Sequence, residues 1–257
     1  MRPVKALGQN FLIRPDIAAE IVAQAGIGAA DTVWEIGPGK GILTRALLKT
    51  GCSIKAFELD RRLEQPLRDE FGDSIELVMG DILKVNWPQE LAEYDEPIKL
   101  AANIPYNITS PLLHHLEKHH QSFNRITLMV QQEVADRICA SPNSKAYGVM
   151  TLRLRRIFDS EILMRVSREC FEPVPKVDSA VLSLKPRALP ADIPDLKKYL
   201  SLISLAFAHR RKTLRNNLSS LADKSRLEQV QTQSGIDLGR RGESLSEAEF
   251  IALSRHF

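Results

Sequence analysis

The sequence lacks the features that mark secreted and membrane-spanning proteins. No stretch approaches the roughly 20 apolar residues that a bilayer requires, and the first sixteen residues contain no apolar run typical of a secretory signal. Three cysteines are present, at positions 52, 139 and 170, without close metal-ligand spacing. This favours reduced thiols over a disulfide or a zinc site. We therefore expect a soluble cytoplasmic protein with no membrane partner and no metal.

A strong overall charge is also missing, because the net charge is only +3 over 257 residues. The charge is nevertheless uneven. Residues 185–257 hold thirteen Lys and Arg against eight Asp and Glu, whereas residues 1–184 hold twenty-two against twenty-four. The excess at the C-terminal end hints at a polyanionic partner. The hydrophobic share of 44% is ample for one large domain, or for a large and a small one.

Apolar segments of strand length alternate with helical segments through the first half of the chain. The expected strands are 32–36, 53–60, 75–81, 98–106 and 125–132, and the expected helices are 16–26, 42–50, 61–72 and 110–119. This alternation is typical of a parallel, doubly wound α/β sheet. Two later strands, 161–167 and 178–184, have no helix between them, so we expect an antiparallel hairpin at the sheet edge. Seven strands ending in this way resemble the class I methyltransferase (Rossmann-like) fold.

Three prolines between residues 186 and 195 mark a linker. Residues 196–257 beyond it have helical periodicity. The sequence therefore predicts a catalytic domain over 1–185, a linker over 186–195 and a small helical domain over 196–257.

A glycine turn, GPGKG, follows the first of the alternating strands directly. Gly37 and Gly39 allow a tight turn and close approach of a ligand, and Glu58 ends the next strand, where an acid can accept both hydroxyls of a ribose. NAD, FAD and S-adenosyl-L-methionine sites share this arrangement, and a turn without a ligand is the plain alternative. The GxGxG spacing favours S-adenosyl-L-methionine, as does Asp81, which can accept a hydrogen bond from adenine or simply cap its loop.

The motif Asn103-Ile104-Pro105-Tyr106 ends the fourth alternating strand, at the edge where open α/β sheets bind ligands. The amino group of adenine is a poor nucleophile because its lone pair is delocalised into the ring. The Asn103 side-chain oxygen and the Ile104 carbonyl can accept its hydrogens, and Pro105 can hold that carbonyl in place. The Tyr106 ring, rather than its hydroxyl, offers a stacking face worth about 1–3 kcal/mol. A proline turn with a buried tyrosine is the alternative.

Asn-Ile-Pro-Tyr resembles the catalytic motif of amino-methyltransferases that act on adenine. Three further segments narrow the resemblance: 8–12 (GQNFL), 171–179 (FEPVPKVDS) and 209–217 (HRRKTLRNN). Over nearly its whole length the chain resembles the KsgA family of small-subunit ribosomal RNA adenine dimethyltransferases. The Erm methyltransferases share the first segment and the NIPY motif, but residues 141–148 and 210–218 look like KsgA.

The resemblance implies transfer from S-adenosyl-L-methionine to two adjacent adenosines near the 3′ end of small-subunit (16S) ribosomal RNA, each becoming N6,N6-dimethylated. We expect a monomer with a role in biogenesis of the small subunit. Phe171 would stack on the base opposite Tyr106, or else be a core aromatic. The implied cofactor contacts are Asn10, Leu12, Gly37, Gly39, Glu58, Asp81, Ile82 and Asn103.

The basic run in residues 209–217 lies on an expected helix, where Arg211 and Arg215 would share a face. We expect RNA phosphate contacts, although a solvated face is possible. The expected contact residues are Arg210, Arg211, Lys212 and Arg215.

A histidine cluster at 114, 115, 119 and 120 lacks the HExxH pattern of zinc sites and predicts a solvated helix face.

Three other functions compete with small-subunit methylation. One is methylation of large-subunit RNA, as in the Erm group. Another is an RNA-binding assembly factor with dispensable catalysis, which the intact Asn103 and Glu58 argue against. The third is an NAD-dependent oxidoreductase, which does not explain the NIPY motif.

Overall fold

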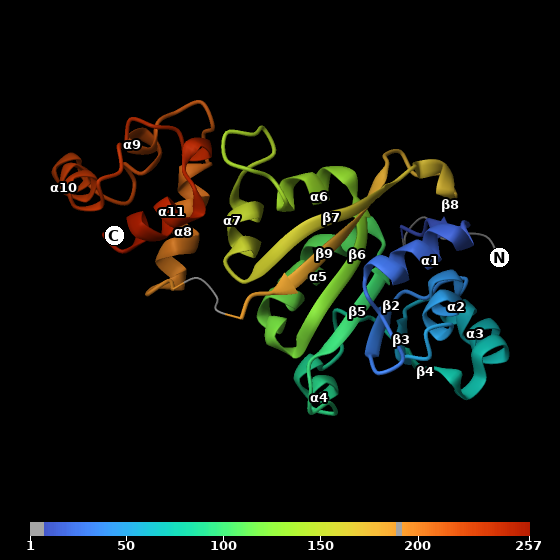
Figure 1. Ribbon diagram of the computed structural model, residues 1–257. Helices are drawn as coiled ribbons and strands as arrows, with labels where there is room; N and C mark the ends of the chain where they lie inside the picture. The colour runs from blue at the N-terminus through green and yellow to red at the C-terminus, as the bar shows by residue number, and fades with distance from the viewer. Residues whose placement is uncertain (1–7, 189–191) are drawn as a thin grey trace. The chain divides into compact units, whose positions relative to one another are not determined.

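The computed structural model describes residues 8–188 and 192–257 (Figure 1). The chain divides into two compact units, one of Met1–Ala135 with Asp159–Pro186 and one of Asp136–Phe158 with Arg187–Phe257. The second unit therefore includes residues 136–158, which the sequence analysis had assigned to the catalytic domain. Tyr147 and Leu152 explain the difference, since both are buried in the core of the C-terminal helices. Residues 189–191 of the predicted linker lie outside the described residues.

The first unit is built on a seven-stranded sheet with the order β4-β3-β2-β5-β6-β9-β7. Strands β2 to β6 run parallel to their neighbours, whereas β9 is antiparallel to β6. This confirms the predicted class I arrangement, with β7 at the edge beside β9. The strands are β2 (Thr32–Ile36), β3 (Ser53–Glu58), β4 (Glu76–Met79), β5 (Ile98–Asn103), β6 (Phe123–Gln131), β7 (Phe158–Val166) and β9 (Ser179–Pro186).

Both faces of this sheet are apolar, as expected for parallel strands covered on two sides. Val33 faces a core shared with α1, α2 and α3, while its neighbour Trp34 points to the opposite face and contacts Phe57, Trp87 and Phe123. That alternation follows from the two-residue period of a strand. The helices are α1 (Pro15–Gln24), α2 (Ile42–Leu48), α3 (Glu64–Phe71), α4 (Trp87–Leu91) and α5 (Thr109–Lys118), and α6 (Gln132–Ile138) begins in this unit and ends in the second.

A separate two-stranded sheet, which the sequence did not predict, joins distant parts of the first unit. Strand β1 (Phe11–Leu12) pairs antiparallel with β8 (Phe171–Glu172), and Leu12 lies opposite Phe171. Two of the segments that carried the family resemblance, 8–12 and 171–179, are therefore neighbours in space.

The second unit is helical and has its own core around Tyr199, Leu245 and Phe250. Its helices are α7 (Val149–Arg155), α8 (Leu196–Ala206), α9 (Leu214–Asn217), α10 (Lys224–Ser234) and α11 (Glu247–Ser254). Among the described residues, no helix of either unit is long and apolar enough to cross a membrane.

The prediction of one helix through the basic run is wrong, because the chain turns between α8 and α9. The Asn217 side chain donates to the carbonyls of Ala206 and His209 at 2.8 and 3.2 Å, and so ties the last residue of α8 to the turn that follows it. The Thr213 side chain then caps the start of α9. Polar side chains that bond to the backbone thus override the helical periodicity.

Candidate active site

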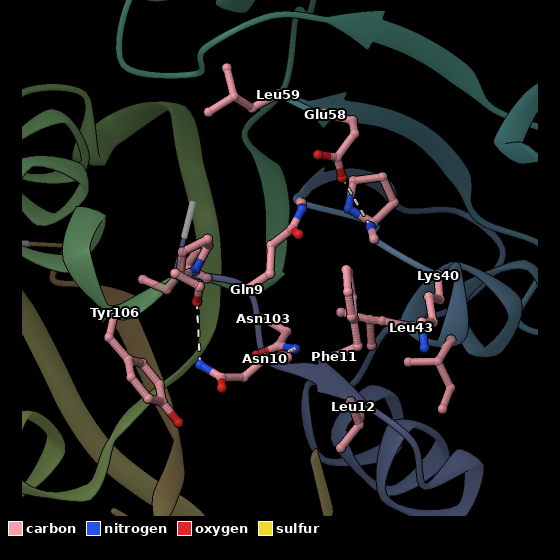
Figure 2. Close-up of a pocket in the computed structure, with 17 residues that line it drawn as sticks. Gln9, Asn10, Phe11, Leu12, Lys40, Leu43, Glu58, Leu59, Asn103 and Tyr106 are labelled. Carbon is pink, nitrogen blue, oxygen red and sulfur yellow. Dashed lines mark hydrogen bonds between the residues drawn. The ribbon is translucent and has the colours of Figure 1, made fainter. Parts of the chain in front are cut away.

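An open cavity lies where β2, β3 and β5 end, at the carboxyl edge of the sheet (Figure 2). Its empty space, mouth included, is about 740 Å³. Four segments far apart in the sequence meet there: residues 8–12, residues 37–43, residues 58–59 and residues 103–106. The cavity therefore brings together most of the predicted cofactor residues and the whole NIPY motif.

The glycine turn packs tightly against the N-terminal segment. Gly37 and Gly39 have positive φ angles of 71° and 58°, which side chains with a Cβ rarely adopt. A Cβ atom on Gly39 would lie only 3.0 Å from the Phe11 ring. Glycine at this position thus allows segment 8–12 to lie directly on the turn.

Glu58 holds the glycine turn in shape. Its carboxylate is buried and accepts hydrogen bonds from the backbone N–H groups of Gly39 and Asp60, at 3.0 and 2.8 Å. Burial raises the pKa of this carboxyl, while the two backbone donors act in the opposite direction. Glu58 lines the cavity as expected, and its contact with a ribose stays a prediction.

Glu35 is an unusual residue that the sequence analysis missed. It lies in β2, two residues before Gly37, and is only 1% exposed. Neither carboxylate oxygen has a hydrogen bond of normal geometry among the described residues. Burial raises its pKa to about 8, with nearby Thr44 acting against this rise and the charge of Glu58 adding to it. An acid inside the apolar run TVWEI was the available signal.

Asn103 ends β5 and has its amide oriented by the N-terminal segment. Its Nδ2 donates to the Asn10 backbone carbonyl at 3.4 Å, and Figure 2 shows the two residues side by side at the cavity. The Asn103 Oδ1 is thereby left as an acceptor for a ligand. Ile104 is buried, and Pro105 has a φ of −56°, so the backbone after Asn103 is restrained.

Tyr106 begins a short 3-10 turn and is half-buried at the cavity wall. Its hydroxyl lies 2.8 Å from the hydroxyl of Ser179, the first residue of β9. Burial raises the pKa of the Tyr106 phenol. The far end of the ring is thus fixed to the sheet.

Two predicted contacts are not seen at the cavity. Asp81 and Ile82 follow β4 and are not among its lining residues, and Asp81 Oδ1 accepts instead from the Leu83 N–H at 3.0 Å. This loop adjoins the site, since the Gly80 N–H donates to the Glu58 carbonyl at 2.8 Å. The cofactor contacts of these two residues stay predictions.

Phe171 is 2% exposed and packs in the core with Phe11 and Leu12. It is not among the residues that line the cavity and packs behind two of them, as a core aromatic does. Stacking on a base, for which the ring would have to leave this packing, stays a prediction.

Polar contacts fasten segment 8–12 on both sides. The Gln9 side chain donates to Asp60 Oδ2 at 2.8 Å. Lys40 in the glycine turn forms an ion pair with Glu172 at 3.2 Å, and its ammonium lies 5.1 Å from the centre of the Phe11 ring. The sequence predicted a role in this segment only for Asn10 and Leu12, as cofactor contacts, because no pattern in it indicated the pairing with β8.

The predicted RNA contacts in the second unit fall into two groups. Arg210 donates to the Tyr147 carbonyl at 2.9 Å and pairs with Glu243 at 2.7 Å, while Arg215 donates to Gln231 at 2.8 Å. Arg211 and Lys212 are exposed and have no side-chain partner within the described ranges. Arg211 lies in the turn before α9, so the expectation that it shares a helix face with Arg215 is wrong.

The histidines in and just after α5 are only partly solvated. His115 and His119 stack on Trp87, with ring centres 5.2 and 5.7 Å apart, and burial lowers both of their pKa values. The prediction of a solvated face is therefore wrong for these two. Over residues 8–188 and 192–257, no group of three or more His, Cys, Asp or Glu is arranged to hold a metal ion.

A parallel sheet with β9 inserted antiparallel before its edge, and a glycine turn at its carboxyl edge, defines a class I methyltransferase. The fold matches the crystal structure of the 23S rRNA methyltransferase ErmE with a TM-score of 0.74 and 28% identity, covering 96% of this chain and 99% of that one. A dimethyladenosine transferase from Plasmodium falciparum has the same fold, with a TM-score of 0.74 and 24% identity over 95% of each chain.

The chain belongs to the ribosomal RNA adenine dimethylase family, whose model matches residues 3–257. The ribosomal RNA small subunit methyltransferase A of Geobacter sulfurreducens is 42% identical over 99% of this chain and 95% of its own length. The protein of the same name from Methylococcus capsulatus is 40% identical over 98% of this chain and 97% of its own.

Proposed function

We propose that this chain transfers methyl groups from S-adenosyl-L-methionine to the N6 amino group of adenosines in small-subunit ribosomal RNA, forming N6,N6-dimethyladenosine. The orientation of Asn103 carries the proposal, because the bond to Asn10 leaves its Oδ1 as an acceptor beside the glycine turn. The two curated relatives named above support the small subunit as the target.

The residues present fit this cofactor. S-adenosyl-L-methionine supplies, when bound, a methyl group on a positively charged sulfur. The glycine turn gives its ligand close access to the backbone, and the buried acid Glu58, which lines the cavity, favours a ligand with positive charge. Leu59, which is 48% exposed, adds apolar surface beside Glu58.

The chain's own groups act mainly by orientation and electrostatics. Asn103 Oδ1 and the Ile104 carbonyl accept the two hydrogens of the amino group, which frees the nitrogen lone pair for attack on the methyl carbon. The Tyr106 ring stacks on the base. The surplus proton leaves to water, because the lining carboxylate Glu58 already accepts two backbone hydrogen bonds.

The positive charge of the second unit supports ribosomal RNA as its partner. Asp136–Phe158 and Arg187–Phe257 together contain seventeen Lys and Arg against nine Asp and Glu. We assign the direct phosphate contacts to Arg211 and Lys212, whose side chains are exposed. Arg210 and Arg215 add charge while they hold the unit together. A monomeric state and a cytoplasmic location remain predictions.

A methylation assay with labelled cofactor tests the proposal. Small subunits that lack the modification are incubated with the protein, and the modified nucleotides are mapped. We expect label on two adjacent adenosines near the 3′ end of the small-subunit RNA. Label on large-subunit RNA would favour the Erm-like alternative. The 28% identity to ErmE is the observation behind that alternative. Binding to the particle without transfer would indicate an assembly factor.

A further inference from the structure

The hydroxyl of Ser179 is the polar contact that holds the Tyr106 ring from the sheet side. The two oxygens are 2.8 Å apart. Ser179 is fully buried and is the first residue of β9, where it pairs with Gln131 of β6. Tyr106, by contrast, is half-buried in a three-residue turn between β5 and α5. A rigid strand thus anchors the tip of a side chain on a short turn.

Neighbouring hydrogen bonds fix Ser179 in turn. The Asp178 carbonyl accepts from the Gln132 N–H at 3.0 Å, so the β9–β6 ladder continues past Ser179. The Asp178 carboxylate accepts from the Arg168 N–H, also at 3.0 Å. Ser179 therefore has little freedom to follow a moving ring, and its hydroxyl defines where the ring tip lies.

We propose that Ser179 is a positioning residue that fixes the position of the Tyr106 ring for the stacked target base. This rests on the proposed function. The phenolic oxygen lies on the axis about which the ring itself turns, so a hydrogen bond there acts on rotation about the Cα–Cβ bond and thereby fixes where the ring lies. Because burial raises the pKa of Tyr106, the phenol keeps its proton through neutral and mildly alkaline pH, and the contact persists there.

The second methyl transfer depends more on the position of the Tyr106 ring than the first. An unmethylated amino group offers two hydrogens, one to Asn103 and one to the Ile104 carbonyl. After one transfer only one hydrogen is left, so hydrogen bonds alone orient the nitrogen less well. Stacking on Tyr106 must then supply more of the orientation. Loosening the ring should therefore slow the second transfer more than the first.

The test uses Ser179→Ala, Tyr106→Phe and the double variant on unmodified small subunits. We expect each single change to lower kcat by roughly 3- to 10-fold, the effect of one hydrogen bond, with little change in KM or in affinity for S-adenosylhomocysteine. The share of N6-monomethyladenosine among the products should rise. The double variant should be no worse than either single one, because all remove the same bond.

Ser183→Ala is the matched control. Ser183 lies on the same strand, is equally buried and pairs with Thr127, away from Tyr106. We expect it to keep the wild-type product ratio.

Three results would overturn the inference: a wild-type product ratio in Ser179→Ala, the same rise in Ser183→Ala, or effects that multiply in the double variant. If Ser179→Ala does not fold, Tyr106→Phe removes the same bond from the other side and decides alone. A wild-type protein that transfers no methyl group would instead overturn the proposed function, and the inference with it.

Discussion

Asn103 has one amide atom engaged by the protein and the other available to a ligand, and this makes it a sensitive residue of the site. Its Nδ2 is bonded to the Asn10 carbonyl, so only Oδ1 is left for the substrate. We expect Asn103→Ala to lower single-turnover methylation by about 10²–10³-fold, the usual effect of removing one preorganised polar group. Thermal unfolding should confirm that the variant is folded.

Asn107→Ala is the control for that experiment, because Asn107 is an exposed asparagine four residues further on. It should retain near-normal turnover. Equal rates for Asn103→Ala and Asn107→Ala would contradict the role given to Asn103.

Glu35 predicts a pH dependence of stability. Because burial raises its pKa to about 8, the folded state binds a proton more tightly than the unfolded state does. Its contribution to stability is therefore greatest at low pH and is lost as the pH rises through about 8. Glu35→Gln, which cannot ionise, should gain stability relative to the wild type between pH 5 and pH 8. Urea unfolding of both proteins across this range measures the effect, and parallel curves would rule it out.

At the scale of elements, the contact between β1 and the glycine turn can be tested through Gly39. Gly39→Ala places a Cβ 3.0 Å from the Phe11 ring and forces alanine into a positive φ, which alone costs about 1–2 kcal/mol. We expect lower stability, and also loss of most of the rise in Tm that S-adenosylhomocysteine gives.

Gly235→Ala separates the effect of backbone strain from the effect of the contact with Phe11. Gly235 ends α10 with a φ of 69°, and a Cβ there would meet nothing within 4 Å. This variant should lose stability through backbone strain and keep the full ligand-induced rise. A full rise in Gly39→Ala would show that the turn tolerates displacement of Phe11.

The large elements were predictable from the sequence, and the small ones were not. Five parallel strands and their helices have strong periodicity, and the NIPY motif was correctly placed at the end of β5. Strands of two residues, such as β1 and β8, are too short to show an alternation of apolar and polar residues, so their pairing could not be predicted. The turn after α8 was missed because the bonds of Asn217 that stabilise it are tertiary contacts.

Burial explains the residue that was missed at the site. Glu35 looks like an ordinary strand residue until its lack of partners is seen. For Phe171 the sequence left base stacking and core packing open, and the structure shows the ring packed in the core, so stacking on a base stays a prediction.

At the scale of the whole chain, positive charge is concentrated in the helical unit. The sheet unit has eighteen Lys and Arg against twenty-three Asp and Glu, whereas the helical unit has more Lys and Arg than Asp and Glu. If Arg211 and Lys212 both contact phosphate, neutralising them should weaken RNA binding and lower its salt slope by about two units. Cofactor affinity should stay unchanged. RNA titrations at several salt concentrations measure this.

Arg210→Gln is the informative comparison within the same run. Arg210 is bonded to the Tyr147 carbonyl and to Glu243, so its loss should lower Tm more than it changes the salt slope. An unchanged salt slope after neutralising Arg211 and Lys212 would show that these two residues are only solvated.

The pairing of β1 with β8 also has a consequence for a chain that is still being synthesised. Translation delivers Phe11 and Leu12 early, but their strand partners, Phe171 and Glu172, emerge only after most of the sheet has been made. Until then segment 8–12 lacks its neighbouring strand, and Lys40 lacks its ion-pair partner. Segment 8–12, which lines the cavity, therefore gains its neighbouring strand only late in synthesis, and a nascent chain that still lacks β8 has one side of its site without that support.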